Sequence, residues 1–269
     1  MTIAVCLLVA PAVPVRGSLV PADDAAADST VERDMSIKVF PYAYYTPETE
    51  FAVGVGGITT FYTSEDKILR PSNVVLSGYY TTSEQYKLTL NPEVYFSRNK
   101  YFAGVDLSFG HYVDKFYGVG NDTPDLGTEG YVADRFGFEV TVEMPPILFV
   151  SDRSGLIWDY ESTTIVDARD NPYLQEGAFA GSSGGTVSGT GLGWVWDRRD
   201  HSFYPTSGDL HDLKMLMYTS ATGSDYRYWT LELDDRRYIR LAEDKVLALQ
   251  FYLDMAMGEA PFDRLPALG

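Results

Sequence analysis

Only a few groups of residues in this chain have the types and spacing that enzyme chemistry requires. Residues 181–185 read Gly-Ser-Ser-Gly-Gly and match the G-x-S-x-G turn of serine hydrolases. That turn needs a strand before it and a helix after it. Residues 186–190 read Thr-Val-Ser-Gly-Thr and predict a strand, so we interpret the run as a flexible outer loop. Residues 64–67 match S-x-x-K, a spacing that is common by chance. We therefore expect no catalytic residue and no enzymatic activity.

Metal-binding patterns are equally weak. The histidines are scattered, with no i, i+4 pair and no cysteine partner, which argues against a zinc site: His111, His201 and His211. One segment offers oxygen ligands of the kind that Ca²⁺ takes, but without the spacing of an EF-hand loop: Asn121, Asp122, Asp125 and Glu129. We expect neither a metal ion nor any other cofactor.

The composition is typical of a membrane barrel. The 269 residues include 20 Tyr, 14 Phe, 4 Trp and 24 Gly, and the mean hydropathy is -0.14. A chain that is rich in aromatic residues and glycine, but only weakly hydrophobic, suits strands that face lipid on one side and water on the other. The formal net charge of -17 repels phosphate backbones, so we expect no nucleic-acid partner.

Residues 1–22 are interpreted as a signal peptide, and residues 23–35 as a polar linker. Residues 3–15 form an apolar run that is too short to span a bilayer but suits the core of a signal peptide. No Lys or Arg precedes Arg16, so we expect this peptide to be incomplete at its N-terminus. The single cysteine, Cys6, lies in the same run and cannot form an internal disulfide.

From residue 36 onward, segments of about ten residues alternate between apolar and polar side chains. In residues 86–96, one set of alternate positions is mostly Leu, Val and aromatic, and the other set is mostly charged or polar. Because successive side chains of a strand point to opposite faces, each such strand has one apolar face. Strands of about 9–14 residues suit a lipid-spanning barrel better than the alternative, a soluble β-protein with its apolar face turned inward. Aromatic residues such as Tyr79, Tyr80 and Trp196 either form an interfacial girdle or pack in the lumen.

The alternation predicts about eleven strands. They span residues 36–45, 50–62, 73–82, 85–97, 101–112, 131–144, 147–164, 186–198, 209–220, 225–240 and 245–258. An odd number of strands does not close the usual single-chain bacterial barrel, and residues 258–269 read as a loop. We therefore expect an all-β fold in which residues 36–269 form part of a transmembrane antiparallel β-barrel.

Two motifs late in the chain resemble those of a known family. The run Asp197-Arg198-Arg199-Asp200, followed by the turn from Pro205 to Gly208, resembles the barrel motif of the BamA/TamA superfamily of bacterial surface antigens. In that family an Asp-x-Arg stretch at a strand end precedes a Pro-x-x-Gly turn, and here Arg198 replaces a small residue. The last residues resemble the opening of that family's long inward-folding loop, through Phe262, Leu265, Pro266 and Gly269.

Two further stretches support the resemblance. Pro41 and Tyr45 lie in a segment similar to the family's first hairpin. A Phe-Tyr-Gly-x-Gly-Asn loop resembles that of relatives without a large periplasmic arm: Phe116, Tyr117, Gly118, Gly120 and Asn121. The resemblance implies that about eleven of an expected sixteen strands are present. It also implies a member without the periplasmic POTRA modules, because residues 1–35 leave no room for one.

The resemblance implies a location in the outer membrane and a role in inserting or translocating other proteins. In such a mechanism a weak seam between the first and last strands opens, and an edge strand pairs with a client strand. Pro41 would weaken pairing in the first strand, because proline has no N–H to donate. A passive pore or structural barrel is the alternative. The expected partners are the lipid bilayer, lipopolysaccharide and client outer-membrane proteins, with no indication of the oligomeric state.

Overall fold

The structure is a computed structural model that describes residues 35–46, 49–64, 70–116, 130–146, 151–168, 171, 174, 177, 179–201, 204–243 and 245–266. The expected signal peptide and all of the expected linker except Met35 lie outside these residues. No helix in the described part of the chain is long and apolar enough to cross a membrane.

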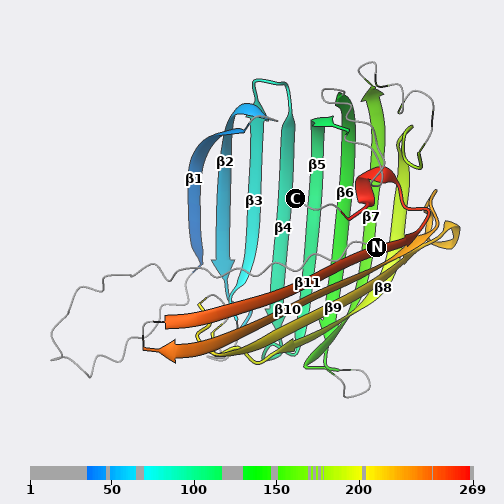
Figure 1. Cartoon of the computed structure of the whole chain (residues 1–269). Coiled ribbons are helices and arrows are strands. Elements are labelled where there is room, and N and C mark those ends of the chain that lie inside the picture. The colour runs from blue at the N-terminus through cyan, green and yellow to red at the C-terminus, as the bar shows by residue number, and fades with distance from the viewer. Residues whose placement is uncertain are drawn as a thin grey trace.

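The described residues form eleven strands and two short 3-10 helices. The strands are β1 (Ser36–Thr46), β2 (Glu50–Phe61), β3 (Ser72–Thr81), β4 (Tyr86–Phe96), β5 (Tyr101–Lys115), β6 (Gly130–Met144), β7 (Arg153–Asp167), β8 (Gly185–Asp197), β9 (Gly208–Tyr218), β10 (Tyr228–Ala242) and β11 (Lys245–Gly258). The helices are η1 (Ser220–Thr222) and η2 (Phe262–Arg264). All strands belong to one sheet in which each pairs with its neighbours in sequence (Figure 1).

The predicted strands agree with these bounds to within three residues, except at the start of β7. That strand was predicted to begin at residue 147 and begins at Arg153, so the prediction was wrong there. The chain bends at Ser151 and Asp152 instead, where the Asp152 amide donates to the Val195 carbonyl of β8 at 2.9 Å and the Ser151 and Ser154 hydroxyls lie 3.0 Å apart. The apolar residues that suggested a strand, 147–150, lie outside the described part of the chain.

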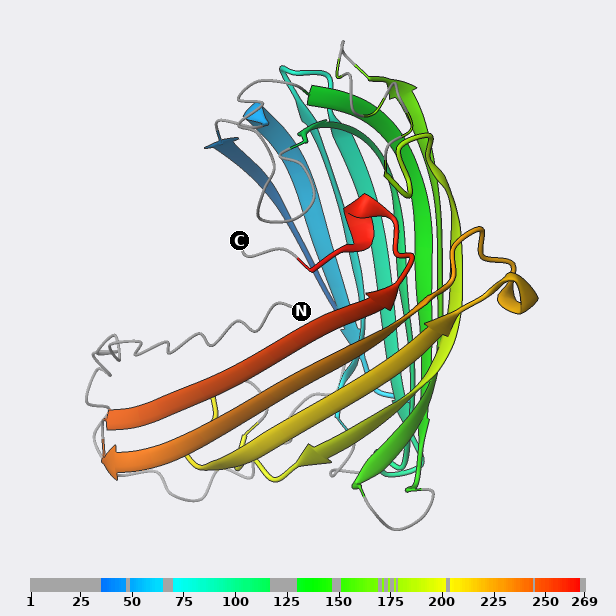
Figure 2. The same cartoon turned by 45° about the vertical axis from the view of Figure 1, so that its right-hand side comes forward.

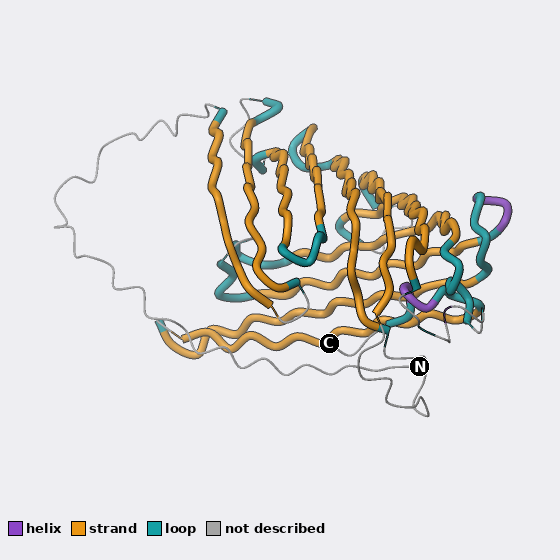
Figure 3. Tube along the Cα trace, turned by 90° about the horizontal axis from the view of Figure 1, so that it is seen from above, coloured by secondary structure: helices purple, strands orange, loops and turns teal. Residues whose placement is uncertain are grey.

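The sheet curls into an open half-cylinder whose two edges are β1 and β11 (Figures 2 and 3). Within the described residues, β1 pairs with β2 alone and β11 with β10 alone. The segment after β11 turns back into the concave side of the sheet, where η2 lies (Figure 2). Connections after odd-numbered strands meet at one end of the sheet, which we call the loop end, and those after even-numbered strands meet at the turn end.

The two faces of the sheet differ in polarity, as the alternation predicted. On the inward face, Ser77 and Thr89 share a hydrogen bond of 2.7 Å, and the Asn73 amide donates to Glu93 at 2.9 Å. On the outward face, the side chain of Leu88 is 52% exposed, and no second layer covers it within the described residues. An exposed apolar face opposite a polar concave face is the arrangement of a barrel wall between lipid and water.

Aromatic pairs mark both ends of the outward face. Phe96 and Tyr101 stack at the turn end, with ring centroids 5.5 Å apart. Tyr86 stacks on His111 at the loop end, with centroids 5.6 Å apart. The 11-residue strand β4 runs from Tyr86 to Phe96. At roughly 3.3 Å per residue and a tilt of about 40°, the two pairs are about 25 Å apart in height, which matches the apolar band of outer-membrane barrels.

Several inward rings lie against glycine residues of a neighbouring strand. The ring of Tyr42 covers Gly54, where an added Cβ would meet it at 2.4 Å. Glycine at such positions lets a large ring lie flat against the wall instead of projecting into the lumen. Tyr79 belongs to the inward set, because its ring contacts Tyr44 at 6.0 Å, whereas Tyr80 is outward and 54% exposed.

Candidate functional site

The β8–β9 turn is built on Asp197, the last residue of β8. The Asp197 carboxylate accepts hydrogen bonds from Nε and Nη2 of Arg199, at 2.8 and 2.9 Å. It also accepts one at 3.2 Å from Nη2 of Arg70, which precedes β3. The hydrogen bond to Asp197 raises the pKa of Arg199. Two guanidinium groups thus share one buried carboxylate, which ties the turn to the β2–β3 connection, five strands away in the sheet order.

Asp200 organises the rest of this turn. Its Oδ1 accepts hydrogen bonds from the amides of Thr206 and Ser207, at 2.8 and 3.1 Å, and its Oδ2 contacts the Thr206 hydroxyl. These hydrogen bonds lower the pKa of Asp200. The bonds from Thr206 have the largest effect, and those from Ser207 have a smaller one. Gly208 closes the turn at φ +100°, and a Cβ there would lie 2.2 Å from the Arg198 carbonyl oxygen. Only glycine fits that position.

The segment after β11 is docked against the concave wall at the loop end. The Phe262 amide donates to the carbonyl of Ala180, in the β7–β8 connection, at 2.9 Å. The Phe262 ring meets the rings of Phe116 and Tyr131 edge-on, with centroids 5.1 and 5.5 Å apart. Two motifs singled out in the sequence, at Phe116 and Phe262, are therefore in contact. The remaining residues of the Phe116 motif and Gly269 lie outside the described residues.

Ion pairs hold η2 from both of its charged residues. The Arg264 guanidinium lies 3.4 Å from Oδ2 of Asp159 and 3.3 Å from Oε1 of Glu161, both on β7. Burial acts to lower the pKa of Arg264, but Glu161 and Asp159 outweigh it and raise that pKa. Asp263 lies 3.7 Å from Arg135 of β6. Burial raises the pKa of the Asp263 carboxyl, and Arg135 opposes that shift.

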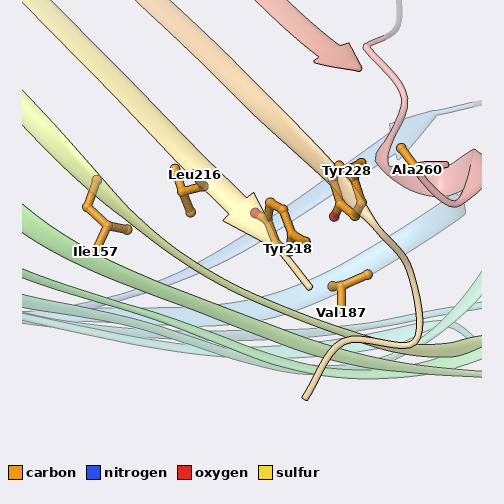
Figure 4. Packing of buried hydrophobic residues seen from close by; sticks show 6 residues of the cluster. All are labelled: Ile157, Val187, Leu216, Tyr218, Tyr228 and Ala260. Atoms are coloured by element: carbon orange, nitrogen blue, oxygen red, sulfur yellow. The ribbon is translucent and has the colours of Figure 1, made fainter. Parts of the chain in front are cut away.

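An apolar patch lies beside these charges, where the loop leaves β11 (Figure 4). Its buried members are Ile157, Val187, Leu216, Tyr218, Tyr228 and Ala260, and Leu265 packs against them. The rings of Tyr218 and Tyr228 stack with centroids 4.2 Å apart and planes 4° apart. The Tyr218 hydroxyl donates to Asp159 at 2.8 Å, so the patch and the ion pair of Arg264 share one carboxylate.

Comparison with known proteins identifies the family. Residues 72–266 match the family model of the Omp85 superfamily domain. The chain belongs to the Omp85 superfamily. A solved structure of BamA from Haemophilus ducreyi, lacking POTRA domains 1–3, has the same fold with a TM-score of 0.55 and 17% sequence identity. The match covers 87% of this chain and 44% of that one, so this chain spans less than half of its length. A search of curated proteins found no match.

As an Omp85 chain, the protein is an outer-membrane β-barrel, and its described strands form an open part of the barrel wall. The predicted seam residues lie on the exposed edge strand β1. Tyr45 is outward and 70% exposed. Pro41 pairs in register with Val55 of β2 and has no N–H for the ladder.

Sequence reasoning did not identify the residues on the Omp85 wall that hold the loop. Arg135, Asp159 and Glu161 are charged residues at inward positions of β6 and β7. The alternation pattern could have selected them, because each is an ionisable group on the face opposite the apolar one. Arg264 stands between the motif residues Phe262 and Leu265, and its charge within an apolar run was the available signal.

Proposed function

We propose that this chain forms part of an outer-membrane barrel that assists the insertion or translocation of other proteins. Membership of the Omp85 superfamily supports this proposal. The observation that carries it is the docked loop, whose Arg264 lies 3.3 Å from Glu161 of the inner wall. A loop fixed by its own ion pairs inside the lumen suits a barrel that acts through its wall rather than by free conduction.

The mechanism we propose is physical rather than chemical. The exposed edge of β1 presents backbone groups that can pair with an incoming strand. Pro41 interrupts that edge, because it contributes no N–H, so a client strand or a closing strand pairs less firmly there. Lipopolysaccharide and client outer-membrane proteins are the proposed partners. No covalent step is involved, and we infer that the protein is not an enzyme.

The test is an insertion assay with the full chain reconstituted in liposomes. An unfolded outer-membrane barrel is added, and its folding is followed by its acquired resistance to protease. We expect faster folding than in liposomes without the chain. A rate equal to that of empty liposomes, together with steady single-channel conductance, would favour the passive pore instead.

A further inference from the structure

Four ionisable side chains of β9 and β10 face outward in the half of each strand nearer the turn end. They lie on the side of the wall that meets lipid. They are Asp209, His211, Asp235 and Arg237, and we call them the outward polar cluster. The register places His211 directly opposite Asp235, and Asp209 directly opposite Arg237. Their orientation follows from the alternation of side chains along each strand. Lys214 of β9 faces inward, because it lies 3.9 Å from the inward residue Glu139. Asp234 of β10 also faces inward and accepts a hydrogen bond from Arg236.

The cluster interrupts the apolar outward surface of β9 and β10. The outward positions toward the loop end are Leu213, Met215 and Met217 on β9, and Met217 is 60% exposed. Toward the turn end, the outward positions Ile239 and Leu241 of β10 are apolar again and are 37% and 65% exposed. Charged groups that face hydrocarbon are unfavourable unless a partner or a headgroup satisfies them. A polar island of this kind is therefore a place where a headgroup can be bound.

The internal contacts of the cluster leave groups available for such a ligand. His211 Nδ1 lies 3.0 Å from Asp235, and His211 Nε2 lies 3.6 Å from Asp209. The side chains of Asp209 and Asp235 remain 27% and 43% exposed, although Oδ1 of Asp209 is itself buried against His211. Arg237 forms no ion pair with any described side chain. The cluster thus offers carboxylate oxygens and one guanidinium within a single pocket.

The shape of the pocket adds an apolar wall. An open hollow of about 390 Å³ is lined by the four cluster residues and by Leu249 and Phe251 of β11. Phe251 stands opposite Asp235 in the register, and Leu249 stands opposite Arg237. At the neighbouring end of β8, the Trp196 ring meets the His211 ring edge-on at 6.5 Å. An outward indole beside a strand end is typical of the boundary between acyl chains and headgroups.

We propose that this hollow binds a phospholipid with a primary ammonium headgroup, drawn from the leaflet at the turn end. The ammonium group donates hydrogen bonds to Asp209 and Asp235, and the phosphate is held by Arg237. The acyl chains lie along Leu249 and Phe251. A zwitterionic headgroup matches the charges better than an anionic one, because two carboxylates flank the single arginine. The site does not depend on the insertion activity proposed above.

The test compares three phospholipids with identical acyl chains on the full chain, delipidated in detergent, by native mass spectrometry. The headgroups are ethanolamine, choline and glycerol. We expect retention of the ethanolamine lipid about tenfold above the other two, since choline has no N–H to donate and glycerol has no cation. Equal retention of the choline lipid, or preference for the glycerol lipid, overturns the proposal. This comparison needs no variant.

Variants then locate the site. We expect Asp209→Asn with Asp235→Asn to lower retention of the ethanolamine lipid about tenfold. The matched control is Asp134→Asn, which alters an outward carboxylate paired with His111 at 2.6 Å near the loop end. It is expected to leave lipid retention unchanged. Strand content measured by circular dichroism confirms that each variant folds. Unchanged retention in the folded double variant, or an equal loss in the control, contradicts the assignment.

Discussion

The docked loop gives the sharpest prediction, because one side chain, Arg264, pairs with two carboxylates of the wall. Arg264→Met keeps an unbranched apolar stem and removes the guanidinium that lies between Asp159 and Glu161. Removing one partner of a buried ion pair costs about 3–5 kcal/mol. The Arg264 side chain is 26% exposed, and solvent screening lowers that figure. We expect a loss of about 2 kcal/mol in loop docking, or about 30-fold in the docking equilibrium.

Hydrogen exchange measures this loss at a defined atom. The Phe262 amide is bonded to the Ala180 carbonyl at 2.9 Å, so it exchanges only when the loop leaves the wall. In Arg264→Met, we expect exchange at Phe262 to be about 30-fold faster, while amides in the middle of β7 keep their protection. Arg227→Met is the matched control, because Arg227 is an exposed arginine at the same end of the sheet.

A triple-mutant cycle separates the ion pairs from general destabilisation. Combining Arg264→Met with Asp159→Asn and Glu161→Gln removes all three charges together. We expect the combined variant to exchange more slowly at Phe262 than the sum of the separate changes predicts, since no uncompensated charge remains. Strict additivity, or exchange at Phe262 that does not change in Arg264→Met, would refute the reasoning.

Three further predictions concern the turn and the loop. Gly208→Ala places a Cβ 2.2 Å from the Arg198 carbonyl oxygen at φ +100°, so we expect a loss of about 2 kcal/mol or more, seen as a lower thermal midpoint. The pKa of Asp200 is lowered in the fold. The hydrogen bond from the Thr206 amide to the ionised carboxylate therefore stabilises the turn fully above about pH 4, and this stabilisation is lost as the pH falls toward the lowered pKa. Exchange at Thr206 against pH should therefore show an acid-dependent opening that Asp200→Asn abolishes. Phe262→Ala removes both ring contacts, and we expect faster exchange in the loop, equivalent to about 2 kcal/mol, with the strands unaffected.

The sequence predicted the strands well because alternation is a local property. The turn of residues 97–100 separates β4 from β5 within one residue of the predicted bounds, since a run of four polar residues cannot continue the apolar face. The start of β7 could not be predicted in the same way. Residues 147–150 are apolar, but the chain bends at Ser151 and Asp152, and the Asp152 amide donates to the distant Val195 carbonyl.

The loop-holding residues show a different limit of sequence reasoning. Arg264 and Glu161 are 103 residues apart in the chain, and no local pattern relates them. The alternation predicts that Glu161 faces the lumen, but it does not predict how far along the barrel axis Glu161 lies. That position depends on the register of every strand between the loop and β7. A contact of this kind requires the assembled sheet.

Three connections of the loop end converge on the same part of the wall, and this has a physical consequence. Phe116 leaves β5, Ala180 belongs to the β7–β8 connection and Phe262 follows β11, yet Phe262 contacts both of the others. Gly181 lies so close that a Cβ there would meet Pro261 at 2.7 Å. Since each connection packs against another, displacing the loop after β11 must also expose the surfaces of the other two. The position of that loop is therefore coupled to β5 through β8 by direct packing, and not only through the hydrogen bonds of the sheet.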